Sequence, residues 1–160
     1  MKRFFCLWAL IVPLLSFARL GETPAQCEAR YGKGEPVQSE KGELMYYTGP
    51  PDFDVSAMFR SVNGGPVVAV LIYYRHKDET IAFTEGEVTR LLQINHKDEK
   101  MVWRRLSTLS LFKKFWASED NTLMACSDVQ ANTFGVASIA YLKEAEQKQK
   151  AQEQARMKGL

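Results

Sequence analysis

The stretch VVAVLIYY at residues 67–74 decides the fold of this chain. β-Branched and aromatic residues favour extended structure. An uninterrupted apolar run of this length is typical of a central strand that is buried on both faces of a sheet. The sequence Asn63-Gly64-Gly65 just before it is a strong tight-turn signal. The turn predicts that residues 67–74 pair antiparallel with the segment that precedes them.

Two further strands are predicted upstream of the turn. In residues 53–61, apolar side chains fall on every second position, so they share one face of a strand. Residues 44–48 form a shorter strand candidate, stopped by the Gly49-Pro50-Pro51 sequence. Residues 33–42 are polar and contain glycine and proline, which predicts a loop.

Two helix starts carry a capping box, in which a threonine and a residue three positions later satisfy each other's backbone amides. The pairs are Thr23 with Gln26, ahead of a predicted helix at residues 24–31, and Thr84 with Glu87, ahead of one at residues 85–95. The two threonines open equivalent helices, each followed by strands, so the chain is predicted to contain two αβββ units.

The remaining elements complete an α+β prediction. We expect an antiparallel β-sheet packed by two short helices, with a polar C-terminal helix outside it. The later strand candidates are residues 101–106, 111–117, 123–129 and 133–138. The predicted organisation is a signal peptide at residues 1–18, a single α+β domain at 19–140 and a polar helical tail at 141–160.

The N-terminal residues have the order of a secretory signal peptide. Lys2 and Arg3 precede an apolar run at residues 4–17, and Ser16 and Ala18 place small residues where a signal peptidase reads. The run has about 14 residues, whereas a helix needs roughly 20 to span a bilayer. Cleavage after Ala18 and a periplasmic or secreted location are therefore expected, with no stable membrane span afterwards. A retained N-terminal anchor on a structural protein is the alternative.

Charge argues against a nucleic-acid partner. The chain has 21 basic and 19 acidic residues, and two of the basic residues belong to the predicted signal peptide. The remaining charge is balanced, whereas nucleic-acid binding needs clustered lysine and arginine. The short groups Arg104-Arg105 and Lys113-Lys114 alternate between the faces of a strand, so neither makes a patch.

Two cysteines, Cys27 and Cys126, follow the predicted cleavage site. In an oxidising compartment they are candidates for one long-range disulfide. Two buried free thiols are the alternative, because free cysteine packs as a small apolar residue. Cys126 alternates with Leu123 and Ala125 along its strand, so its side chain is expected on the opposite face.

One short motif resembles a known family. Gly21, Thr23, Cys27 and Gly32 have the spacing G-x-T-x3-Φ-x4-G, where Φ is an apolar residue. This resembles the opening helix of small envelope proteins related to the outer-membrane assembly lipoproteins and the β-lactamase-inhibitor-like fold. The resemblance implies an exported protein-interaction module and names no partner. The chain departs from the pattern at Pro36, which comes later than in the family, and it lacks the lipidated cysteine.

Catalytic chemistry has little support in the sequence. His76 and His96 each open the tetrapeptide HKDE, and imidazole beside carboxylates could bind a metal or move protons. The predicted helix at residues 85–95 separates the two tetrapeptides by about 16 Å, at 1.5 Å per residue, so one metal cannot easily collect both histidines. No cofactor-binding motif occurs, and no cofactor is expected. A small periplasmic hydrolase or metal-dependent enzyme using His76 and His96, or Cys27 and Cys126, is the alternative function.

The favoured function is a non-enzymatic, exported protein-interaction module of the bacterial cell envelope, with an unknown envelope protein as its partner. Aromatic side chains in the strands supply the candidate binding face, because such residues are enriched at interfaces. Adjacent tyrosines in a strand point to opposite faces, so one of each pair is expected inside and the other outside. The candidate residues are Tyr46, Tyr47, Tyr73, Tyr74, Trp103 and Trp116.

Overall fold

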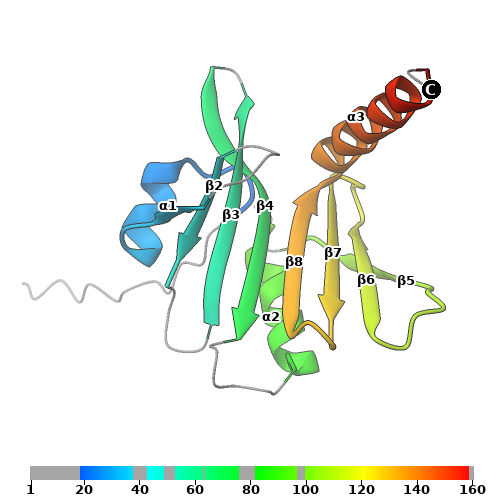
Figure 1. Cartoon of the computed structure of the whole chain (residues 1–160). Coiled ribbons are helices and arrows are strands. Elements are labelled where there is room, and N and C mark those ends of the chain that lie inside the picture. Colours follow the sequence, from blue (N-terminus) through cyan, green and yellow to red (C-terminus); the bar gives the residue numbers. More distant parts are fainter. Residues whose placement is uncertain are drawn as a thin grey trace, which may run out of the picture.

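The computed structural model describes residues 19–37, 43–48, 53–62, 64–75, 82–96 and 100–158. The described strands form one antiparallel sheet of eight, in the order β1-β2-β3-β4-β8-β7-β6-β5 (Figure 1). This confirms the predicted α+β class. The elements are α1 (Pro24–Tyr31), β1 (Glu35–Val37), β2 (Glu43–Tyr47), β3 (Phe53–Val62), β4 (Gly65–Arg75), α2 (Glu85–Ile94), β5 (Trp103–Leu106), β6 (Lys113–Ser118), β7 (Leu123–Asp128), β8 (Thr133–Ser138) and α3 (Ile139–Lys158).

The chain is built from two units, each a helix followed by a four-stranded meander. One unit contains α1 and β1 to β4, and the other contains α2 and β5 to β8. Their last strands, β4 and β8, pair antiparallel, with Ile72 opposite Gly135 at the middle of the pairing. This pairing, the central seam, joins the two units into one sheet.

The prediction of three strands in the first unit was one strand short. Glu35–Val37 forms β1 within the segment predicted as a loop. All three of its residues are exposed, and the strand lies at the edge of the sheet. An edge strand tolerates Pro36, whose missing amide hydrogen is not needed by a second neighbour. Because this short segment is polar and exposed, its sequence lacks the apolar alternation from which a strand could be predicted.

Both predicted capping boxes are present. Gln26 N lies 3.4 Å from Thr23 Oγ1, and Glu87 N lies 3.3 Å from Thr84 Oγ1. In each helix the side chain of the later residue also accepts from the threonine amide. Gly32 ends α1 with a φ of 84°, a conformation that glycine adopts without strain. The two helices thus begin where their sequences place them.

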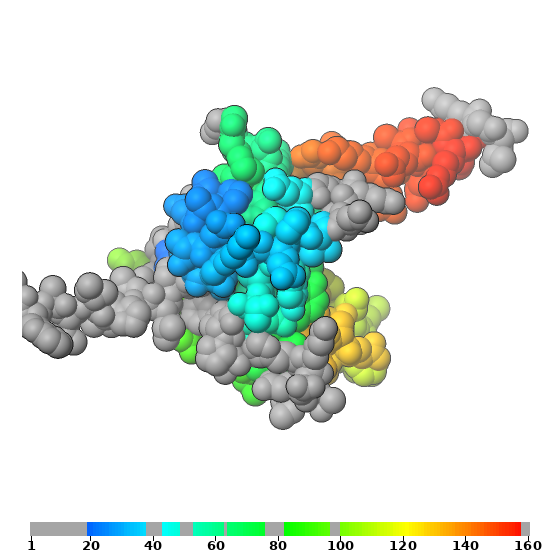
Figure 2. Space-filling view, turned by 60° about the vertical axis from the view of Figure 1, so that its left-hand side comes forward, coloured from blue at the N-terminus to red at the C-terminus, as the bar shows by residue number. Residues whose placement is uncertain are grey.

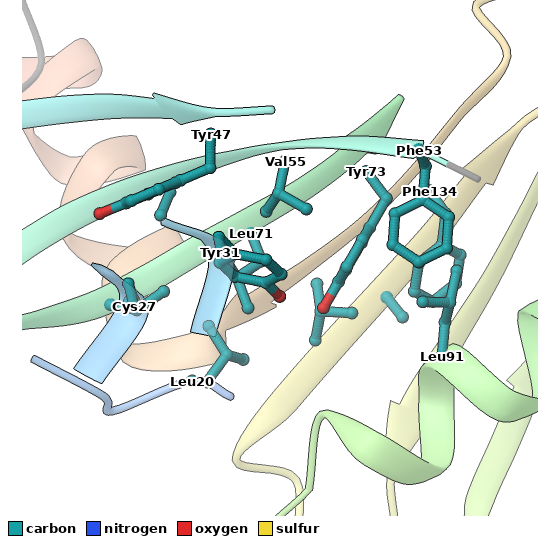
Figure 3. Packing of buried hydrophobic residues seen from close by; sticks show 14 of the residues in the cluster. Leu20, Cys27, Tyr31, Tyr47, Phe53, Val55, Leu71, Tyr73, Leu91 and Phe134 are labelled. Carbon is teal, nitrogen blue, oxygen red and sulfur yellow. The ribbon is translucent and has the colours of Figure 1, made fainter. Parts of the chain in front are cut away.

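The core lies between the sheet and the helices α1 and α2 (Figure 3). We call the sheet face that packs against these helices the covered face, and the opposite one the open face. Tyr73 is fully buried on the covered face, with its ring 5.4 Å from Phe53 and 6.1 Å from Phe134. Its hydroxyl lies 2.9 Å from Nδ2 of the buried Asn95, at the end of α2. This polar pair satisfies two groups that burial would otherwise penalise.

Strand β4 is central in the sheet, as predicted, but helices of the described segments cover only one of its faces. Leu71 and Tyr73 are fully buried on the covered face. Ile72 and Tyr74 alternate with them and are partly exposed on the open face. The prediction of burial on both faces was therefore wrong for the described part of the chain, since α1 and α2 both lie on the same side.

The polar C-terminal helix α3 begins two residues earlier than predicted and lies outside the sheet. The Tyr141 hydroxyl hydrogen-bonds the Met58 sulfur, and Glu144 pairs with Arg60 at 3.2 Å. Beyond these contacts the helix reaches away from the body of the molecule (Figure 2). Within the helix, Glu144 pairs with Lys148 and Glu146 pairs with Lys150, in each case four residues apart. Across the described segments, none of the helices is both long and apolar enough to cross a membrane.

Candidate interaction surface

The open face carries an apolar band across most of the sheet. Strand register places side chains from neighbouring strands in rows across it. The central row crosses seven strands and contains Tyr46, Ser56, Ile72, Gly135, Cys126, Phe115 and Leu106. The row beside it contains Leu44, Met58, Val70, Ala137, Met124 and Ala117 and ends at Arg104. The small residues Ser56, Ala117 and Ala137 are buried, and the larger apolar side chains of the two rows are partly exposed.

Small residues at the middle of this band make a shallow depression in the open face. Gly135, at the central seam, lies between Ile72 and Cys126 in its row. A Cβ atom at Gly135 would meet nothing closer than 3.7 Å, so the site tolerates a side chain and the glycine is not required by packing. The larger Ile72 and Phe115 stand on either side. The open face thus combines a shallow centre with aliphatic and aromatic flanks.

A polar cluster borders the band on the first unit. Asp54 lies opposite Tyr74 in the β3–β4 register, and the Tyr46 side chain hydrogen-bonds Asp54. Burial and this hydrogen bond raise the pKa of Tyr46 to about 12, so its hydroxyl stays protonated at neutral pH. Asp54 is buried although no described helix lies over it. Two tyrosines beside a carboxylate give this end of the open face hydrogen-bonding capacity.

The six predicted binding residues are split between the two faces. Tyr46 and Tyr74 are partly exposed on the open face. Tyr47 and Tyr73 are fully buried on the covered face, and their pKa values are raised by burial. The alternation predicted for adjacent tyrosines therefore holds. Trp103 and Trp116 also belong to the covered face, where they pack against the core.

Several open-face residues were not among the predicted binding residues. The main ones are Ile72, Met58, Met124, Phe115, Gly135 and Cys126. The sequence signal that could have found them is the alternation of side chains along a strand, because every second residue points to the same face. Ile72 is two residues from Tyr74 and therefore lies on the same face of its strand. Met124 is likewise two residues from Cys126, whose side chain the sequence already predicted on the face opposite to Ala125. Aromatic content alone did not separate the two faces.

The candidate disulfide is not formed. Cys27 and Cys126 are both free thiols. Cys27 lies in α1 and is fully buried on the covered side, whereas Cys126 lies on the open face. The sheet stands between them, which prevents the close Cα approach that a disulfide requires. Burial raises the pKa of Cys27 to about 12 and also raises that of Cys126, so both thiols lack the lowered pKa of a nucleophile.

The histidine alternative is only partly testable, because His76 lies outside the described residues. His96 follows α2, and its Nε2 lies 3.5 Å from Asp120 Oδ2. Asp120 sits in the β6–β7 turn, where hydrogen bonds from the Ser118 hydroxyl and from Thr122 lower its pKa to about 2. The Ser118 hydroxyl is almost fully buried and also binds the Leu123 backbone, which suits a turn-fixing role. Within the described ranges no three histidine, cysteine or acidic side chains gather as a metal site.

No protein-family model, curated protein or solved structure matches this chain.

Proposed function

We propose that this chain is a non-enzymatic, exported protein-interaction module of the bacterial cell envelope, which binds its partner through the open face. The observation that carries the proposal is a difference between the sequence pattern of β4 and the burial of its two faces in the structure. Its sequence has the pattern of a strand buried on both faces, yet Ile72 and Tyr74 are covered by no described helix. A partner seated on the open face would complete that burial.

The dimensions of the open face suit a protein better than a small molecule. The central row runs from β2 to β5, and at about 4.8 Å between strands it spans roughly 30 Å. Protein interfaces of standard size bury about 800 Å² on each partner. Tyrosine, phenylalanine and methionine are enriched in such interfaces, and the band presents all three.

Export is proposed from the N-terminal sequence. Lys2 and Arg3, the apolar run at residues 4–17 and the small residues Ser16 and Ala18 support cleavage after Ala18. The envelope assignment rests on the resemblance of the α1 motif. The mass of the protein recovered from its own cells tests this part separately, because cleavage would leave Arg19 as the first residue.

The non-enzymatic part of the proposal rests on the two thiols and on His96. A cysteine nucleophile needs a lowered pKa, whereas the pKa values of Cys27 and Cys126 are raised. His96 lies beside the β6–β7 turn, in which the Asp120 carboxylate already accepts hydrogen bonds from the hydroxyl groups of Ser118 and Thr122. These groups are better explained by packing and turn geometry than by catalysis.

The test is affinity capture from envelope extract of the source organism, with mass spectrometry of the recovered proteins. The probe is Ile72→Lys, which places a charge in the middle of the open face. The matched control is Gln93→Lys, on the exposed side of α2. We expect one partner to be recovered reproducibly with the unmodified chain and with Gln93→Lys, and to be lost with Ile72→Lys.

Circular dichroism of the purified baits establishes that each variant is folded. Retention of the same partner by folded Ile72→Lys would show that the open face is not the binding surface. A folded and abundant unmodified bait that recovers no partner would count against stable protein binding altogether.

A further inference from the structure

A second hollow lies at one end of the central seam, outside the apolar band of the open face. It is a groove of about 650 Å³. The pairing of β4 with β8 begins only at Val70, so residues 65–69 extend past the end of β8. The groove occupies the resulting space between the β3–β4 hairpin and the start of α3, which lie at the same end of the molecule (Figure 1).

The walls of the groove are mainly aliphatic. Three neutral polar side chains also line it, Asn121, Thr122 and Ser138, and each is already hydrogen-bonded within the chain. The main apolar contributors are Leu20, Val62, Val67, Val68, Leu123 and Ile139. The backbone groups of Val68 in the wall are already paired. The Val68 N–H donates to the Glu22 carbonyl at 2.8 Å, and its carbonyl accepts from the Gly21 N–H at 2.9 Å. A hydrocarbon chain fits such a wall, whereas a peptide would leave its own amides without partners there.

The charged side chains that line the groove have one sign. Among the described lining residues they are Arg60 and Lys143, and none is acidic. Arg60 pairs with Glu144 at 3.2 Å. Lys143 is exposed at the start of α3 and forms no ion pair with the parts of the chain that the structure describes. An anionic group at the rim would therefore meet one cation, Lys143, that is not already in an ion pair with a described residue.

We propose that this groove binds a medium-chain fatty acid, with the hydrocarbon chain against the aliphatic walls and the carboxylate at Lys143. The volume lies within the range of about 300–1,000 Å³ that is usual for small-molecule sites. The site is independent of the proposed partner surface, so failure of either proposal leaves the other standing.

The experiment measures binding of dodecanoate to the expressed chain by displacement of a fluorescent fatty acid. Ala140→Trp fills the groove from an exposed position on α3, and Ala151→Trp places the same side chain farther along the same helix. Lys143→Glu reverses the charge at the rim, and Arg156→Glu makes the equivalent change outside it. All four variants share the N-terminus of the unmodified chain, so any binding to that segment cancels in the comparison.

We expect Ala140→Trp to weaken dodecanoate binding by roughly tenfold or more and Lys143→Glu, an exposed charge, to weaken it by about three- to fivefold, while both controls match the unmodified chain. Shortening the ligand to decanoate should weaken binding by up to about fourfold for each methylene removed. Unchanged affinity in both Ala140→Trp and Lys143→Glu would overturn the proposal, as would the absence of binding to the unmodified chain. Equal affinity for methyl dodecanoate would refute the role of the cationic rim. If Ala140→Trp does not fold, the Lys143→Glu comparison still decides the question.

Discussion

Two neighbouring residues in β4 test whether the open face is exposed in the isolated protein. Leu71 is fully buried on the covered face, and Ile72 is partly exposed on the open face. We compare Leu71→Thr with Ile72→Thr. Both variants introduce the same β-branched residue into adjacent positions of one strand, so strand propensity largely cancels.

The expected magnitudes differ because the surroundings differ. Leu71→Thr loses buried hydrocarbon, leaves a cavity and buries a hydroxyl group, which together cost about 4 kcal/mol of unfolding free energy. Ile72→Thr loses hydrocarbon that is already partly hydrated, and its hydroxyl can reach water, so the cost is about 1 kcal/mol or less. With a urea m-value of about 2 kcal/mol/M, the midpoints should fall by about 2 M and about 0.5 M respectively.

Urea unfolding followed by tryptophan fluorescence measures both changes, because Trp103 and Trp116 pack against the core. Repeating the titration over a range of protein concentrations identifies any contribution from self-association. Equal losses for Leu71→Thr and Ile72→Thr, independent of concentration, would show that the open face is buried within the chain. The proposed interaction surface would then be refuted.

Three further predictions concern single sites. Tyr73→Phe should lower the free energy of unfolding by about 1–3 kcal/mol, because it removes a buried hydrogen bond. Tyr74→Phe should change the free energy of unfolding by less than about 0.5 kcal/mol. Equal effects of the two variants would contradict the assigned faces. In the folded protein a maleimide should label Cys126 and spare Cys27 until urea unfolds the chain, and loss of both thiols without a reductant would instead reveal a disulfide. Asp120 has a pKa lowered from 3.8 to about 2, so its stabilising contribution is complete above about pH 4 and is lost as the pH falls through 2. Asp120→Asn should therefore destabilise at pH 7 and lose most of this deficit near pH 2, as measured by thermal unfolding. An equal deficit at both pH values would contradict this.

Local signals predicted most of the elements. The threonine caps placed α1 and α2 correctly, because a capping box is formed by residues within one turn of each other. The Gly64-containing turn predicted the β3–β4 pairing for the same reason. Strand β1 was missed, because its exposed Glu35-Pro36-Val37 sequence has no apolar partner face to produce a pattern.

The candidate site depended on information that is not local. Alternation predicted that Tyr46 and Tyr47 point apart, but not which of them lies under a helix. That choice is fixed by the register with β3 and by the side of the sheet to which α1 returns. The row from Ile72 to Gly135 and Cys126 depends on the pairing of β4 with β8, two strands far apart in the chain with no turn between them to reveal the contact.

The central seam has a consequence for how the molecule could be divided. A cut between Arg75 and Glu85 would separate the two helix-and-meander units without breaking either meander. Each fragment would then expose the backbone edge that the seam pairs in the intact chain, on β4 in one fragment and on β8 in the other. An unpaired strand edge is a template for pairing with another strand. The two fragments should accordingly reassemble when they are mixed. In its architecture the chain therefore corresponds to a heterodimer whose two subunits are covalently linked, and it is a candidate for split-protein complementation.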